Sequence, residues 1–403
     1  MSSIISKIKF YLLVLIAFFI PGYIFLTPLC IVLFILAWVL EGNLKQKVNA
    51  WWKNKYALLF SGFYLLYVLW LAFTPDLQTG LFNIEVKLSL GIFPILLAYE
   101  GKFSDEKQNK LMWAFISGCA VNGIICLVHA IWKYYILGIY QFTYSQFSMF
   151  LHPSYYSMYI DLALLFIFYR AASSQINISV KGKAGLVFIA IFLLILLILL
   201  QSKAGMICTV LLLGSFLVKL FMNKTYRKAA IITLLGCIAI AAGTYYSLVT
   251  KQHSRFNMIE TLAASGKMDS TSSESTQARF FISKAAKEVI AEKPFLGYGT
   301  GQAWGKLQEQ YKKDGYTGSS KHMLNAHNQY LQCIIDTGFI GLICMLGCFI
   351  IPLIKAVREK RFVYGSFLCI LLINMFVESM LEQQAGTMFY GLFNSILMFN
   401  FVI

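Results

Sequence analysis

One polar segment, residues 250–328, lies between two long blocks of apolar sequence and holds the side chains best suited to chemistry. His327 stands near its end, and a neutral imidazole can accept a proton from an incoming hydroxyl. Arg279 lies earlier, and its planar guanidinium suits a phosphate better than a Lys does. Taken singly, His327 could merely cap a helix and Arg279 could reach lipid headgroups. Together they indicate chemistry at the bilayer surface.

Local patterns predict the elements that position these two residues. Apolar residues recur at helical spacing over 277–293, and Pro294 ends that helix because it disfavours helical geometry in the residue before it. This helix would lie along the membrane surface or cap the transmembrane bundle. Gly297, Gly299 and Gly301 follow in a short turn before a second helix. No Gly-Lys-Ser/Thr follows the glycines and no strand precedes them, so we interpret the turn as structural.

His327 is expected to open the helix of the next membrane span, because apolar residues continue at helical spacing from Tyr330 onward. Asn325 or Asn328 could cap this helix. A helix amino terminus carries free amide hydrogens and the positive end of the helix dipole, so it favours anions.

Further polar residues could share the site. Lys203 and Lys87 are two of the few cations expected on the outer side, and Arg255 lies in the polar segment itself. His152 adds a polar group that we also expect near the outer membrane surface. An external cavity lined by cations beside the membrane would suit a lipid-linked phosphate.

Composition identifies the architecture as all-α and polytopic. The chain of 403 residues is 59% hydrophobic and only 13% charged, about half the charged share of a soluble domain. Runs that approach the roughly 20 apolar residues of a membrane-spanning helix predict about twelve spans. We place them at 8–22, 24–41, 57–74, 83–99, 111–134, 155–170, 184–201, 204–222, 229–248, 333–354, 363–379 and 384–402.

Charge placement predicts the orientation. Lys and Arg are concentrated in one set of connecting segments, which makes that side cytoplasmic and places both termini there. The polar segment is then external, so residues 1–248 would hold spans one to nine, 249–328 a periplasmic loop with two amphipathic helices, and 329–403 spans ten to twelve. The net charge of +16 thus follows from topology and does not indicate nucleic acid. The nine Cys show no metal-ligand spacing.

The chain resembles the O-antigen ligase and polymerase superfamily. The resemblance rests on Ser202-Lys203-Ala204-Gly205, on Arg279 with the turn Pro294–Gly299, and on His327–Leu331 running into Asp336–Gly341. Each motif is short, and their order and topological placement make the match specific. The resemblance implies a GT-C-type membrane glycosyltransferase in the bacterial inner membrane. It would transfer a glycan from undecaprenyl pyrophosphate, without metal or cofactor, to a sugar hydroxyl on the periplasmic side.

The resemblance also implies roles for individual residues. His327 would be the general base and Arg279 would bind the pyrophosphate, with Lys203, Lys87 and Arg255 as further cations for it. Lys203 stands where many relatives carry Arg, which keeps the charge but loses the bidentate fork. Asn328, His152 and Tyr330 would support the site. The expected partners are the lipid-linked glycan, a lipid A–core acceptor and membrane lipids.

Several functions remain open on the sequence. We favour an O-antigen ligase, whose acceptor is lipid A–core. A polymerase would instead join repeat units on the lipid carrier, and a protein O-oligosaccharyltransferase would use a Ser or Thr. Relatives of that last kind tend to carry more external sequence after the final spans than follows here. A flippase without chemistry would also need a cavity for a lipid pyrophosphate, and a scaffold in an export complex would need neither His327 nor Arg279.

Overall fold

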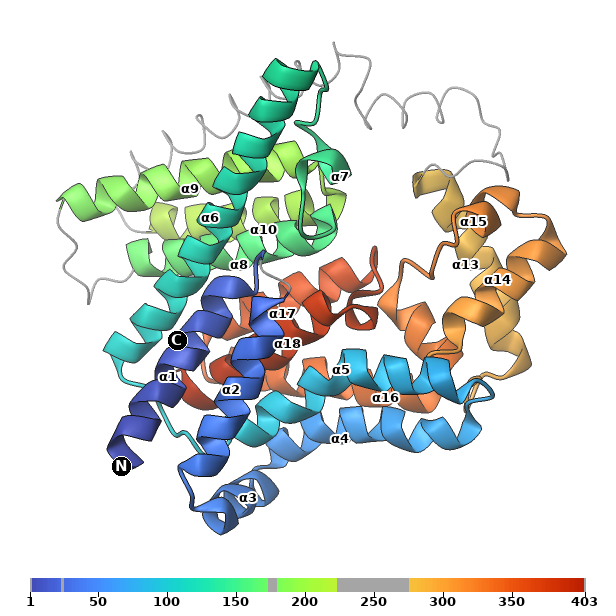
Figure 1. Ribbon diagram of the computed structural model, residues 1–403, viewed down its shortest axis with the longest axis horizontal. Helices are drawn as coiled ribbons and strands as arrows, with labels where there is room; N and C mark the ends of the chain where they lie inside the picture. The colour runs from blue at the N-terminus through green and yellow to red at the C-terminus, as the bar shows by residue number, and fades with distance from the viewer. Residues whose placement is uncertain (1, 23–24, 173–179, 223–274, 402–403) are drawn as a thin grey trace.

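The computed structural model describes residues 2–22, 25–172, 180–222 and 275–401, and in this part of the chain all regular structure is helical (Figure 1). The first ten helices are α1 (Ser2–Phe19), α2 (Leu26–Leu40), α3 (Leu44–Lys53), α4 (Lys55–Trp70), α5 (Leu77–Leu97), α6 (Asp105–Leu137), α7 (Tyr144–Phe147), α8 (Pro153–Ala172), α9 (Val180–Leu200) and α10 (Lys203–Met222). The later elements are α13 (Ser275–Glu292), α14 (Ala303–Asp314), α15 (Thr317–Lys321), α16 (Gln329–Arg358), α17 (Phe362–Met375), the 3-10 turn η3 (Met380–Glu382), α18 (Gln384–Ser395) and a π-helical end η4 (Ile396–Asn400).

Several of these helices could span a membrane, as the sequence predicts. Within the described residues, five are long and apolar enough, or six if α2 and α3, bent by 111°, form one broken span. Shorter apolar helices lie at Lys203–Val218 and in α17. Each predicted span overlaps a helix except 229–248, which lies outside the described residues. The count of about twelve crossings stays a prediction.

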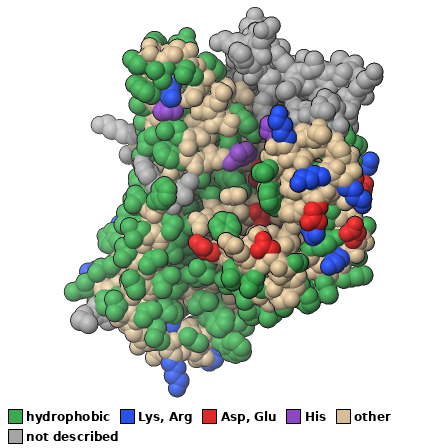
Figure 2. All heavy atoms as spheres, turned by 45° about the vertical axis from the view of Figure 1, so that its right-hand side comes forward, with side chains coloured by type: hydrophobic (Ala, Val, Ile, Leu, Met, Phe, Trp, Pro, Cys, Tyr) green, Lys and Arg blue, Asp and Glu red, His purple; other side chains and the backbone are tan. Residues whose placement is uncertain are grey.

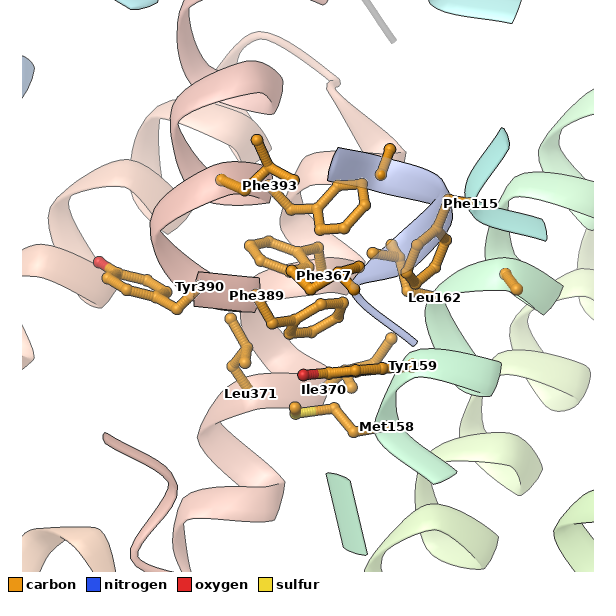
Figure 3. Packing of buried hydrophobic residues seen from close by; sticks show 14 of the residues in the cluster. Phe115, Met158, Tyr159, Leu162, Phe367, Ile370, Leu371, Phe389, Tyr390 and Phe393 are labelled. Atoms are coloured by element: carbon orange, nitrogen blue, oxygen red, sulfur yellow. The ribbon is translucent and has the colours of Figure 1, made fainter. Parts of the chain in front are cut away.

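A layer of aromatic side chains joins α6, α8, α17 and α18 in the centre of the bundle (Figure 3). The ring of Phe115 packs edge-on to Phe393, with centroids 4.6 Å apart. Tyr159 stacks on Phe389 at 4.3 Å. Aromatic pairs of this kind add about 0.5–1.5 kcal/mol beyond the area they bury. The layer fixes α8 against α17 and α18, and the polar residues discussed below lie at the ends of these helices.

The polar segment before α16 forms a small helical unit with a core of its own. Its helix α13 buries Ala278, Ile282 and Ala286 against α14 and α15, and Ile335 of α16 belongs to the same cluster. The unit lies at the right of Figure 1, at the ends where α5 and α16 begin. Helix α13 therefore caps the transmembrane bundle, which is one of the two placements that its amphipathic pattern allows.

The glycine-rich turn before α14 inserts into a break in α16. At Gly338 the backbone of α16 leaves helical geometry (φ 68°, ψ −170°). The Phe339 amide donates to the Pro294 carbonyl at 2.8 Å. The amides of Tyr298 and Gly299 donate to the carbonyls of Ile335 and Asp336, both at 2.9 Å. The turn thus replaces helical hydrogen bonds that the break removes, as buried backbone groups require.

The Asp336 side chain extends the same junction. Its Oδ1 accepts a hydrogen bond from the Ala303 amide at 2.8 Å, so α16 caps the first turn of α14. Thr300 Oγ1 donates to the Tyr67 carbonyl at 2.6 Å and ties the turn to α4 as well. The interpretation of the three glycines as structural agrees with this packing.

Replacing Gly338 by Ala should destabilise the protein by about 2 kcal/mol or more, because the site combines a positive φ with overpacking. A Cβ there would lie 2.0 Å from the Phe295 carbonyl oxygen. The measurement is the midpoint of thermal unfolding in detergent. Gly347→Ala is the matched control in the same helix, since the nearest atom to its Cβ would be 3.8 Å away. Equal midpoints for the two variants would contradict the role of the break.

Candidate active site

A cavity of about 630 Å³ opens between the start of α8, the segment before α16 and the connection from α17 to α18. Figure 2 shows histidine and acidic side chains in the middle of this face, between a mostly hydrophobic part and a part rich in charged side chains. The cavity is lined by Ile20, Thr27, Phe82, Val86, Phe150, Leu151, His152, Tyr155, Asn325, His327, Glu378, Glu382, Gln383, Gln384, Ala385 and Met388.

Glu378 is at the centre of the polar part of this cavity. Its side chain is 5% exposed, and it follows the end of α17. The Nδ1 atom of His327 lies 3.4 Å from Glu378 Oε1, and the Nδ1 atom of His152 lies 3.8 Å from Oε2. The hydroxyl of Tyr144 is in turn 3.4 Å from His152 Nε2. A buried carboxylate thus faces two imidazoles that come from distant parts of the chain.

The charge of Glu378 is compensated within the cluster. Burial raises the pKa of the Glu378 carboxyl, but His327, His152 and Arg279 more than offset this and hold the pKa below its ordinary value. The carboxylate is therefore ionised at neutral pH. An ionised Glu378 favours the His327 tautomer with its proton on Nδ1, which leaves Nε2 as a proton acceptor.

His327 is held in an unusual backbone conformation. Its φ is 42°, in the left-handed region that few residues other than Gly adopt. Asn325 Oδ1 accepts a hydrogen bond from the His327 amide at 2.9 Å and secures this geometry. The expectation that His327 opens the helix is wrong in detail, because α16 begins at Gln329 with Asn328 as its N-cap. His327 lies just outside the helix, where its side chain can line the cavity.

Arg279 reaches the cluster from α13. Its Nη2 donates a hydrogen bond to the Val377 carbonyl at 3.0 Å, one residue before Glu378. The guanidinium is also close enough to help lower the pKa of Glu378. Folding therefore brings Arg279 and His327, 48 positions apart in the chain, to the same carboxylate.

Lys87 has a different environment from the one the sequence suggests. It is fully buried, and its Nζ lies 2.7 Å from Glu382 Oε2 and 2.6 Å from Asn83 Oδ1. Gln329 Nε2 donates to the other Glu382 oxygen at 3.3 Å. Because Glu382 neutralises it, Lys87 is poorly placed to contact a phosphate. Lys87 instead holds the second carboxylate that lines the cavity.

The remaining predicted site residues fall into three groups. Asn328 Oδ1 accepts from the amides of Tyr330 and Leu331, which makes it a helix cap, and the Tyr330 hydroxyl donates to the Leu372 carbonyl. Lys203 is half-buried at the first residue of α10 and does not line the cavity. Arg255 lies outside the described residues. Within the described part, no three His, Cys, Asp or Glu side chains are grouped to hold a metal ion.

Two cavity residues, Glu378 and Glu382, were missed by the sequence reasoning. The predicted span 363–379 included Glu378 as a membrane-spanning residue, whereas α17 ends at Met375 in the structure. The available signal was a pair of carboxylates four residues apart in an otherwise apolar part of the chain. Such charges near a membrane are costly unless they are paired or functional, and this could have marked them.

Comparison with known proteins supports one family. Residues 188–346 match the family model described as O-antigen ligase. The "ComP-specific O-oligosaccharyltransferase" of Acinetobacter baylyi is 24% identical, over 95% of this chain and 69% of its own length. A provisionally named polysaccharide ligase of Rickettsia conorii is 28% identical, over 41% of this chain and 39% of its own. An uncharacterised protein of Haemophilus influenzae is 25% identical, over 88% of each chain.

Replacing Glu378 by Gln should lower the thermal midpoint at neutral pH, by an amount that shrinks on acidification. A carboxyl with a lowered folded pKa stabilises the fold above its ordinary value of 4.5 and loses that contribution as the pH falls through the folded pKa. The measurement compares thermal unfolding of the wild type and the variant between neutral pH and pH values below 4.5.

The control for this comparison is Glu309→Gln, which removes an exposed ion pair with Lys306. Exposed pairs contribute little, so this variant should match the wild type throughout. A stability difference for Glu378→Gln that is the same at both ends of the pH range would show that its charge is not the cause.

Proposed function

Since the chain belongs to the O-antigen ligase superfamily, we propose that it transfers a glycan from undecaprenyl pyrophosphate to a sugar hydroxyl of lipid A–core. The transfer takes place at the periplasmic face of the bacterial inner membrane. The observation that carries the proposal is the approach of His327 to the buried Glu378 carboxylate in a cavity that an acceptor sugar could enter.

The proposed step is a displacement at the anomeric carbon. The acceptor hydroxyl oxygen attacks this carbon while Nε2 of His327 takes the hydroxyl proton. The bond from the anomeric carbon to the pyrophosphate oxygen breaks, and its electron pair leaves with the pyrophosphate. Attack opposite the leaving group inverts the anomeric configuration. A pyrophosphate leaves readily once cations neutralise its charge, so the step requires no metal.

Each proposed role rests on a contact in the cluster. Glu378 orients the imidazole of His327 and stabilises the cation that forms when it takes the proton. Arg279 neutralises the pyrophosphate, because its guanidinium is permanently charged and lies close enough to Glu378 to help lower the pKa of that carboxyl. Lys203, the first residue of α10, stays a proposed ligand of the pyrophosphate. The left-handed conformation of His327 suits a constrained functional residue, since strain of this kind is concentrated at active sites.

Replacing His327 by Ala should reduce transfer about 10²–10⁴-fold, the usual contribution of a general base. Binding of the lipid-linked donor should be retained, because the cations remain. The measurement is transfer by the purified protein in detergent, with donor binding followed separately. His322→Ala, an exposed His on the same segment, is the control and should keep full activity. Full transfer by His327→Ala would contradict the role of His327 as general base, whereas no transfer by the wild type would support a flippase or a scaffold instead.

A second function deserves a direct test because one relative is named an O-oligosaccharyltransferase and aligns with 95% of this chain. The acceptor of such an enzyme would be a Ser or Thr of a protein.

For a ligase, deleting the gene should leave bare lipid A–core while long polymer stays on the lipid carrier. The measurement is a lipopolysaccharide gel blotted for the surface polysaccharide, with a glycoprotein stain beside it.

The other outcomes identify the alternatives. A core that carries a single repeat unit would indicate a polymerase. Normal lipopolysaccharide together with loss of a glycoprotein band would indicate the protein-directed enzyme. Re-expression of the wild-type gene, compared with the His327→Ala form, controls for effects of the deletion on neighbouring genes.

A further inference from the structure

A second polar cavity, of about 470 Å³, lies at the opposite ends of the helices that carry the active site. Helices α5 and α16 both begin beside the α13–α15 unit (Figure 1). At their other ends, Ala98 and Lys355 line this cavity. It is therefore at the other membrane surface. Its lining residues are Asn54, Tyr56, Ala98, Lys102, Lys355, Glu359, Arg361, Met398, Phe399 and Phe401.

Two of its cations share one neutral partner. Lys102 Nζ lies 3.3 Å from the Phe401 carbonyl oxygen, and Arg361 Nη2 lies 2.9 Å from the same atom. Arg361 also donates to the carbonyls of Met398 and Leu397 at the end of η4, which locks its position. The fold thus holds two positive charges side by side on a carbonyl, which cannot neutralise them.

The described carboxylates do not balance this charge. Glu359 alone among the lining residues is acidic; it pairs with Lys355 and is 4.0 Å from Arg361 Nη1. Three cations therefore face one anion. Burial and the nearby Arg361 and Lys355 lower the pKa of Lys102, as expected where positive charge is in excess.

Helix ends of both kinds meet at the cavity. Asn54 and Arg361 are the N-cap residues of α4 and α17, whereas Ala98 and Glu359 are the C-cap residues of α5 and α16. Because amino and carboxyl ends carry opposite partial charges, the excess positive charge comes from the side chains. The other walls are apolar, with Ala98, Met398 and Phe399 among them. Close by, Val357 on α16 is 68% exposed and Phe362 on α17 is 45% exposed, which offers surface for acyl chains.

We propose that this basic cavity binds the phosphate group of an anionic phospholipid at the membrane surface opposite the active site. Basic pockets between transmembrane helices bind anionic lipid headgroups in this way. The apolar walls and the exposed Val357 and Phe362 favour a lipid over a free phosphate. This site is separate from the His327 cavity and does not depend on the proposed function.

The test is lipid binding to the full-length protein in detergent, measured by native mass spectrometry with phosphatidylglycerol and with zwitterionic phosphatidylethanolamine. The wild type should prefer phosphatidylglycerol. Lys102→Gln combined with Lys355→Gln should weaken that binding roughly tenfold or more, since each Lys near an anionic lipid contributes appreciably. Gln can still donate to the Phe401 carbonyl, so the fold should be preserved, and an unchanged thermal midpoint in lipid-free detergent checks this.

The matched control is Lys45→Gln combined with Lys53→Gln, which removes two exposed charges from α3. It should leave the affinity for phosphatidylglycerol within about twofold of wild type, because charges screened by salt contribute little. A Lys102→Arg variant keeps the cation and should retain binding. Equal losses in both double variants, or no preference between the two lipids, would overturn the site. If inorganic phosphate at the same concentration competed as well as phosphatidylglycerol, the ligand would be free phosphate and not a lipid.

Discussion

The site depends on one buried carboxylate. An ionised side chain removed from water is costly unless charged or polar partners compensate it, and Arg279, His327 and His152 are such partners for Glu378. These three come from the segment before α16, the start of α8 and helix α13. The requirement to compensate one buried charge therefore holds three separate segments around one cavity.

The second constraint is the break in α16. A helix interrupted at membrane depth must give its freed backbone groups new partners, and the turn Pro294–Gly299 supplies them. The same junction attaches the α13–α15 unit to the membrane helices, with Asp336 capping α14. Since Arg279 belongs to that unit, its distance from Glu378 depends on the junction. The glycines thus act on the site indirectly, through the position of Arg279.

The two ends of the bundle differ in how far their buried charges are compensated. At the active-site end, Lys87 and Glu382 neutralise each other inside the protein, and Glu378 faces Arg279 and the imidazoles of His327 and His152. At the other end, Lys102, Lys355 and Arg361 exceed the single nearby Glu359. The first arrangement leaves little uncompensated charge in the cavity, which suits the neutral acceptor sugar that we propose. The second leaves positive charge available for a ligand at the membrane surface.

Sequence by itself determined the helical membrane class and the helix before Pro294, because apolar periodicity and helix stop signals are local. It also singled out the segment holding Arg279 and His327, whose role stays a proposal. It also placed Asn328 among the possible caps, which the structure confirms. Only the tertiary structure decided that Lys87 pairs with Glu382, that His327 stands outside the helix, and that Glu378 joins His327 to Arg279. These facts depend on contacts between residues far apart in the chain, and local spacing carries no information about such contacts.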